Sequence, residues 1–177
     1  SENEQALGGA IDNAYGTITG AIKGSFISNY TSGKSSSGGA INNARGRIGS
    51  IEDVRFYNNY SKATGATESA IGGAISNTNG TIGNISGSSF ESNRVSSSRF
   101  SFGGAIDNEA GTISNINADF INNYAVSTAN KARGGAIDNG NGGQIGTISG
   151  SFTGNYVQAA GSGNFARGGA IHNSAYS

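Results

Sequence analysis

Two aspartates and the only histidine of the chain, Asp107, Asp138 and His172, occupy one position of a recurring motif. Each of them follows the Ile of a Gly-Gly-Ala-Ile tetrapeptide. If the tetrapeptides stack in neighbouring coils about 4.8 Å apart, the three side chains form a contiguous row. Carboxyl groups about 5–5.5 Å apart can serve a retaining glycosidase, and an acid–acid–His row can share a divalent cation.

The other copies of the motif weaken this chemical interpretation. The whole column reads Asp12, Asn42, Ser76, Asp107, Asp138 and His172. Alternation along a strand places the column on an exposed outer face, and Asp is common beside turns for backbone reasons alone. We therefore expect no enzyme, no catalytic residue and no cofactor. Asp107, Asp138 and His172 are kept only as a weak candidate for a metal site.

Aromatic and basic side chains gather in five variable stretches, which are residues 30–37, 60–71, 94–102, 124–133 and 156–167. The stretches hold seven of the eleven basic residues and a single acid, in a chain of zero net charge. We interpret them as loops along one edge, which in repeat proteins is often the binding edge. A Tyr row beside Lys and Arg suits an acidic glycan, lipopolysaccharide or a protein partner; the alternative is a soluble edge whose rings shield the stack. The candidate contact residues are Tyr30, Lys34, Tyr60, Lys62, Arg94, Arg99, Tyr124, Lys131, Arg133, Tyr156 and Arg167.

An internal repeat defines the elements that must position these residues. Gly-Gly-Ala-Ile occurs six times at spacings of 30 to 34 residues, and one Phe-x-x-Asn lies between successive copies. The coils begin near residues 8, 38, 72, 103, 134 and 168. The apolar runs are too short for helices and fit the period of two that is typical of strands. We predict one all-β domain over residues 1–177, a right-handed parallel β-helix (β-solenoid) of about five and a half coils.

Side-chain alternation predicts which residues of each coil face inward. In the first copy of the motif, Gly9, Ile11 and Asn13 are expected to point inward, and Ala10 and Asp12 outward. Stacked Asn amides can hydrogen-bond along a ladder when strands repeat every 4.7–4.8 Å. Two Asn columns fit this expectation, namely Asn13, Asn43, Asn77, Asn108, Asn139 and Asn173, and Asn29, Asn59, Asn93, Asn123 and Asn155.

The composition agrees with a β fold and excludes several classes of protein. The chain has 19 Ile and one Leu, and because β-branched residues favour strands, a helix bundle is excluded. It has no Pro, whose missing N–H would break a ladder bond inside a stack. The lack of Cys excludes a disulfide scaffold. No run is long and apolar enough to cross a membrane as a helix, and zero net charge argues against nucleic acid as a partner.

The alternating Gly-Gly-Ala-Ile and Phe-x-x-Asn tetrapeptides resemble the paired motifs of the chlamydial polymorphic membrane proteins. More broadly, the chain is similar to the β-helical passengers of autotransporter adhesins, and the resemblance spans residues 8–173. It implies a passenger domain that is exported through an outer membrane, held at the bacterial cell surface and used for adhesion. It also implies that the tetrapeptides are repeat framework. The chain departs from the chlamydial proteins in lacking Cys.

These observations lead to one expected function and two alternatives. We expect a non-enzymatic cell-surface adhesin or structural rod, a segment of a longer rod or fibre, with the loop edge as its contact surface. Its partner would be a host-cell or surface glycan or protein. One alternative is an extracellular fibre subunit that self-associates end to end. The less favoured alternative is a secreted polysaccharide lyase or hydrolase, since long β-helices offer grooves for extended sugars.

Overall fold

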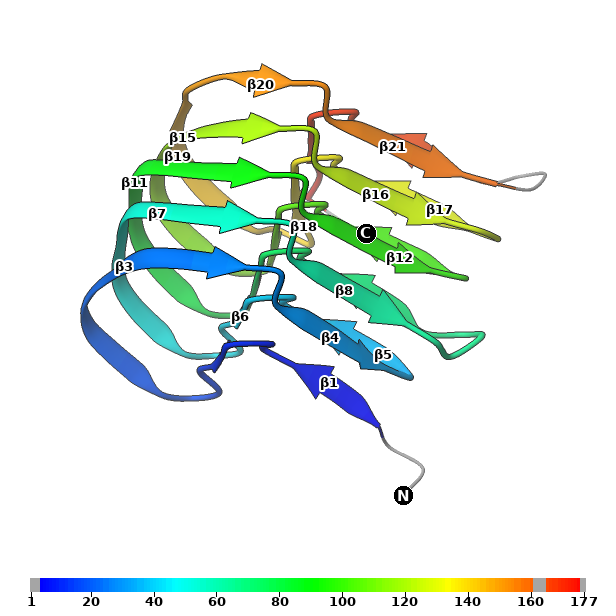
Figure 1. The fold of residues 1–177 in the computed structure, drawn as a ribbon, viewed down its shortest axis with the longest axis horizontal. Coiled ribbons are helices and arrows are strands. Elements are labelled where there is room, and N and C mark those ends of the chain that lie inside the picture. Colours follow the sequence, from blue (N-terminus) through cyan, green and yellow to red (C-terminus); the bar gives the residue numbers. More distant parts are fainter. Residues whose placement is uncertain (1–3, 161–164, 176–177) are drawn as a thin grey trace.

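The computed structural model describes residues 4–160 and 165–175, and every regular element in these ranges is a β-strand. The chain winds as a parallel β-solenoid of about five turns, as the repeat predicts (Figure 1). Each complete turn adds one strand to each of four parallel sheets, which we call A, B, C and D.

The strands of each sheet follow in order along the stack. Sheet A contains β1 (Gln5–Leu7), β5 (Ser35–Ser37), β9 (Ser69–Ile71), β13 (Phe100–Phe102), β17 (Lys131–Arg133) and β22 (Ala166–Arg167). Sheet B contains β2 (Ile11–Asp12), β6 (Ile41–Asn42), β10 (Ile75–Thr78), β14 (Ile106–Glu109), β18 (Ile137–Gly140) and β23 (Ile171–Asn173). Sheet C contains β3 (Thr17–Ile27), β7 (Arg47–Tyr57), β11 (Thr81–Glu91), β15 (Thr112–Ile121), and β19 (Gln144–Ser149) with β20 (Phe152–Thr153). Sheet D contains β4 (Tyr30–Gly33), β8 (Tyr60–Ala63), β12 (Arg94–Ser97), β16 (Tyr124–Ser127) and β21 (Tyr156–Ala159).

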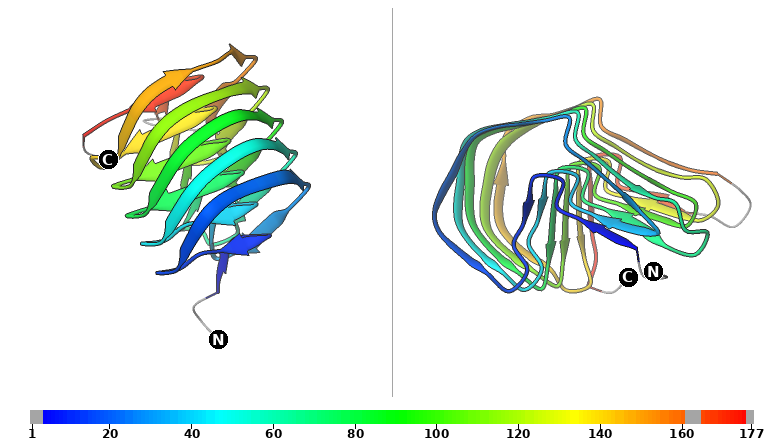
Figure 2. Two further views of the ribbon diagram at one scale, coloured as in Figure 1. Left: turned by 90° about the vertical axis from the view of Figure 1, so that its left-hand side faces the viewer. Right: turned by 60° about the horizontal axis from the view of Figure 1, so that its bottom comes forward.

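The cross-section of the solenoid has two parts, a lobe and an arm (Figure 2). Sheets B and C enclose the lobe, whose apolar cluster contains Ile and Phe side chains from both sheets. Sheets D and A run out from the lobe and back as the arm, with a separate cluster of Ala and Val between them.

Each variable stretch therefore contains two strands of the arm, joined at its tip by short connections such as residues 64–68 and 128–130; residues 161–164 of the last stretch lie outside the described residues. The interpretation of the whole stretches as loops was wrong. Their small residues alternate with larger ones and pair two sheets face to face, as Ser61 and Ala63 of β8 do.

Identical side chains stack through the lobe. The five Phe of the Phe-x-x-Asn motifs form a continuous column, with neighbouring ring centroids 4.6 to 5.1 Å apart and ring planes within 8° of parallel. Three Ile columns accompany them, and strand pairing sets Ile41, Ile75 and Ile106 opposite one another. Burial of these side chains provides the main apolar stabilisation of the fold.

Both Asn columns form ladders along the stack. In the first, Nδ2 of Asn13, Asn43, Asn77, Asn108 and Asn139 each donates to Oδ1 of the Asn in the next coil at 2.7 to 2.8 Å. In the second, the corresponding distances from Asn29 to Asn155 are 2.8 to 3.0 Å. The side chains are mostly buried, and the ladders satisfy their amides there.

The predicted outward direction of the Ala column was wrong. Ala40, Ala74 and Ala105 are fully buried and belong to the lobe cluster together with the Ile that follows each of them. Strict alternation fails because the preceding glycine pair turns the chain from sheet A to sheet B, and Gly38 has a positive φ of 62°. At this corner the N–H groups of Ala40 and Ile41 both donate to the Ala74 carbonyl oxygen.

Candidate functional site

The outer face of sheet D carries a row of aromatic side chains with one arginine, which we call the Tyr–Arg column. Strand pairing places Tyr30, Tyr60, Arg94, Tyr124 and Tyr156 opposite one another in consecutive coils. The Arg94 guanidinium lies 4.1 Å from the centre of the Tyr60 ring, and the Tyr124 and Tyr156 rings stack 4.9 Å apart. Tyr30 is 50% exposed and Tyr156 is 45% exposed, so the column offers a flat surface to a partner.

Of the remaining predicted contact residues, only Lys62 shares this face. Lys62 lies on sheet D beside the column, while Lys34 and Arg99 lie at the tip of the arm, between the strands of sheets D and A. The other three, Lys131, Arg133 and Arg167, belong to sheet A. The single basic edge expected from the sequence is thus divided between two faces and the tip, because each variable stretch crosses both sheets of the arm.

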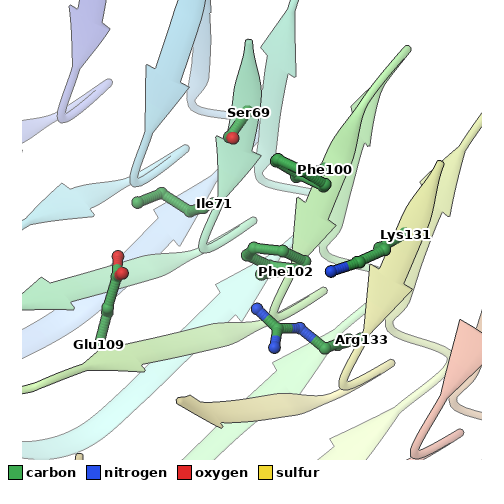
Figure 3. Close-up of a pocket in the computed structure, with 7 residues that line it drawn as sticks. All are labelled: Ser69, Ile71, Phe100, Phe102, Glu109, Lys131 and Arg133. Atoms are coloured by element: carbon green, nitrogen blue, oxygen red, sulfur yellow. The ribbon is translucent and has the colours of Figure 1, made fainter. Parts of the chain in front are cut away.

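A groove lies where the outer face of sheet A meets the outer face of sheet B, and we call it the A/B groove (Figure 3). It contains a cavity of about 300 Å³. The residues that line the cavity are Ser69, Ile71, Phe100, Phe102, Glu109, Lys131 and Arg133. Six of the seven come from three consecutive strands of sheet A, and Glu109 comes from the end of β14 in sheet B.

Cations and aromatic rings are interleaved on the sheet A wall of the groove. Strand pairing sets Phe100 opposite Lys131 and Phe102 opposite Arg133. The Arg133 guanidinium carbon lies 3.8 Å from the centre of the Phe102 ring, and the Arg99 guanidinium carbon lies 4.5 Å from the centre of the Phe100 ring. Each cation is thereby held in a defined position by the ring beneath it.

The row of Asp107, Asp138 and His172 lies on sheet B, on the side that faces the arm. The three residues are paired across neighbouring strands, as the sequence predicts. The expectation that the row is exposed was wrong, because Asp107 and Asp138 are only 2% and 1% exposed. The arm folds back beside sheet B, so that Arg133 of sheet A reaches the Asp138 carboxylate.

Hydrogen bonding and burial give the two carboxyl groups different electrostatic environments. His172 Nδ1 lies 2.6 Å from Oδ1 of Asp138, and Arg133 Nε lies 3.8 Å from its Oδ2. Burial raises the pKa of Asp107 well above its ordinary value, and the nearby Asp138 and Glu109 carboxylates raise it further while Arg133 opposes them. Asp107 Oδ2 has no hydrogen-bond partner. The raised pKa of Asp107 favours the protonated form of its carboxyl group.

The geometry does not support the weak metal candidate. In residues 4–160 and 165–175, no three His, Cys, Asp or Glu side chains are grouped so that they could hold a metal ion. The Asp138 carboxylate is already engaged by His172 and Arg133.

Five residues of the groove were not predicted from the sequence, which are Ser69, Ile71, Phe100, Phe102 and Glu109. The alternating Phe-Ser-Phe of β13 was the available signal, since residues two apart on a strand share a face. The face itself points into a groove only because the arm lies against sheet B, which no pattern within one coil reveals.

Comparison with known proteins identifies no relative. In the part of the chain that the structure describes, no helix is long and apolar enough to cross a membrane. No family model, curated protein or solved structure matches this chain.

Proposed function

We propose that this chain is a non-enzymatic rod of the adhesin type that is exported to the bacterial cell surface and binds a host or surface partner through its arm. The observation that supports the proposal is a difference between the two parts of each coil, the lobe and the arm. The lobe repeats the same Phe, Ile and Asn in every coil, whereas the outer faces of the arm differ from coil to coil apart from the Tyr that recurs in four of the five strands of sheet D. A constant interior with a variable outer face is typical of solenoids that serve as extended binding scaffolds.

The Tyr–Arg column supplies the chemistry for such a contact. Tyr and Arg are among the side chains most enriched at binding hot spots, because a ring or a guanidinium offers both a flat apolar surface and a polar group. Arg94 is oriented by Tyr60 and by a 2.9 Å hydrogen bond from its Nη1 to Oδ1 of Asn58. A partner therefore meets a surface whose side chains are already ordered, which lowers the entropy cost of binding.

Cell binding by the purified, fluorescently labelled chain tests this proposal. The double variant Tyr60→Ser, Arg94→Gln removes the centre of the Tyr–Arg column, and flow cytometry on cultured mammalian cells measures the loss. We expect binding to fall about tenfold or more, because loss of a single hot-spot residue commonly costs that much.

A matched control is available on another face of the same coils. The Arg55 guanidinium lies 4.3 Å from the centre of the Tyr57 ring at the end of β7, so Tyr57→Ser, Arg55→Gln removes an equivalent pair from sheet C. This variant should bind as the unchanged chain does. The proposal is wrong if the unchanged chain binds no cells, or if both double variants lose binding equally.

A further inference from the structure

The A/B groove has the features of a ligand site that the proposed adhesive surface does not use. It lies on the outer face of sheet A, whereas the Tyr–Arg column lies on the outer face of sheet D, the other sheet of the arm. Its cavity of about 300 Å³ is at the lower end of the range for small-ligand sites, enough for about one or two sugar rings.

Aromatic side chains give the groove an apolar platform. Phe100 and Phe102 lie on the same face of β13, with ring centroids 5.7 Å apart and planes inclined by 19°. Ile71 of the preceding coil is paired with Phe102 and extends the platform along the stack. Because the two rings stack on each other and the Arg133 and Arg99 guanidinium groups lie over Phe102 and Phe100, a bound ring such as a pyranose would pack against the edges of the two phenyl groups.

Two cations border the platform. Figure 3 shows Lys131 and Arg133 extending from β17 toward Phe100 and Phe102, with Glu109 on the other wall of the groove. Arg133 is 7% exposed, and its Nε has no hydrogen-bond partner although it faces Asp138 at 3.8 Å. The ion pair with Asp138 is long and makes no hydrogen bond, so an anionic group in the cavity, which Arg133 lines, would add a charge partner to the guanidinium.

The walls of the groove favour a carbohydrate over an extended peptide. Both walls are faces of sheets, and their backbone N–H and C=O groups pair with the neighbouring coils. An extended peptide that binds by adding a strand needs an unpaired sheet edge, which these walls do not offer. The side chains present instead offer apolar ring edges, cations for an acid, and Ser69 and Glu109 for hydroxyl groups.

We propose that the A/B groove binds an acidic carbohydrate, with a sugar ring packed against the edges of Phe100 and Phe102 and its carboxylate paired with Lys131 and Arg133. Glu109 accepts hydrogen bonds from sugar hydroxyls on the opposite wall. This site is independent of the Tyr–Arg column.

Calorimetric titration with tetragalacturonate tests the proposal. The methyl ester of tetragalacturonate is the matched control ligand, because it has the same rings but no charge. We expect the acid to bind and the ester to bind at least about tenfold more weakly, because the paired charges are lost. Raising the ionic strength should weaken binding of the acid. When tetragalacturonate is titrated into the protein, the backbone amide NMR signals of β13 and β17 should shift, and those of β8 and β12 should stay in place.

Two substitutions and one control assign the binding to the groove. We expect tetragalacturonate binding to weaken about tenfold in each of two variants. Lys131→Gln removes a charge. Phe100→Ala removes one of the two rings of the platform. Lys23→Gln changes the net charge equally on sheet C, where Lys23 is 61% exposed, and should leave binding unchanged. Each variant is checked for an unaltered unfolding transition.

The proposal is overturned if tetragalacturonate does not bind, if the ester binds equally well, or if Lys23→Gln weakens binding as much as Lys131→Gln. A negative result here leaves the cell-binding test of the Tyr–Arg column unaffected, because that test uses other residues and another readout.

Discussion

The lobe and the arm belong to the same coils but have different interiors. Between sheets B and C, large side chains such as Phe56 and Phe90 are fully buried and stack on their counterparts. Between sheets D and A, the interior consists of small residues, with Val95 the largest member of its buried apolar cluster. Hydroxyl groups fill the remaining positions, as where Ser61 Oγ donates to Ser36 Oγ at 2.9 Å.

This difference indicates which part of the coil carries stability and which part is available for variation. Buried apolar area scales with side-chain size, so the lobe contributes most of the apolar stabilisation. Small residues let sheets D and A pack closely, and their backbone bonds hold the arm in register with the lobe. The outer faces of the arm can then carry Tyr, Phe, Lys or Arg at little cost to folding. Substitutions in the two parts should therefore have very different effects.

The largest effect is expected at the corner that joins the arm to the lobe. A Cβ at Gly73 would overlap the Gly104 carbonyl oxygen and lie 2.6 Å from the Arg94 nitrogen, both of which are backbone atoms. Gly73→Ala should destabilise the chain by at least about 4 kcal/mol or prevent folding, because neighbouring coils cannot separate locally. Urea denaturation followed by circular dichroism measures the change.

Gly20→Ala is the matched control for this substitution. Gly20 lies in β3, and a Cβ there meets no heavy atom within 4 Å. Its unfolding free energy should stay within about 1 kcal/mol of the unchanged chain. Equal midpoints for the two variants would contradict the close approach of the coils at the glycine pair.

Paired truncations in the two interiors compare the lobe and the arm directly. Phe90 is fully buried, with ring centroids 4.6 Å from Phe56 and 4.8 Å from Phe120. Phe90→Ala should cost about 3–5 kcal/mol, because it removes a ring and leaves a cavity inside a continuous column. Val95→Ala in the arm should cost about 1–2 kcal/mol, since it removes two methyl groups from an equally buried site. If both variants lost the same stability in urea, the arm would be as tightly packed as the lobe.

The acid row beneath the arm gives a third, pH-dependent test. The pKa of Asp107 is raised from 3.8 by burial and by Asp138. The protonated side chain therefore makes its full contribution to the free energy of unfolding at low pH. That contribution is lost as pH rises from about 4 through the raised pKa, by up to about 1.4 kcal/mol per pH unit. Asp107→Asn should remove this slope and make the chain more stable than the original at neutral pH. Thermal unfolding across a pH series measures the difference between the two chains.

Asp119→Asn is a control of opposite sign for the pH series. Asp119 is exposed, and its pKa is lowered because the Ser151 hydroxyl and backbone N–H donate to its carboxylate. Its contribution is present at neutral pH and is lost as pH falls through the lowered pKa. If the Asp107→Asn substitution lowered stability at pH 7, the carboxyl group of Asp107 would stabilise the fold there, and the raised pKa of Asp107 would be wrong.

The sequence predicts the lobe better than the arm, for a physical reason. Phe, Ile and Asn recur at fixed spacing because identical side chains must stack in consecutive coils, so their columns are visible in the chain itself. The arm has no repeated tetrapeptide, and its strands were mistaken for loops. Apart from Val95, its buried inner residues are Ser, Ala and Thr, such as Thr31 and Ser36, which lack the apolar signal of a core.

The candidate site was predictable only in part, because it depends on how the arm lies against sheet B. The register of Asp107, Asp138 and His172 followed from the repeat. Their burial beside Arg133 did not, since the angle at the glycine pair is a tertiary feature. The Tyr–Arg column was recognisable because its members begin four of the five variable stretches with the same residue type and the fifth with Arg94.

The smallest effect on stability is expected at the Tyr–Arg column, and it separates folding from binding. Arg94→Gln removes the contact with the Tyr60 ring at 4.1 Å and the hydrogen bond to Asn58, both on the surface of the arm. A cation–π contact at a partly exposed site is worth about 0.5–1 kcal/mol, so the urea midpoint should move only slightly. The same substitution should weaken cell binding clearly, because the proposed role of the column is to contact a partner and not to stabilise the coils beneath it. A large loss of stability would mean that the outer face of the arm helps to hold the coils together, and the proposed separation between a stabilising lobe and a variable binding arm would then be wrong.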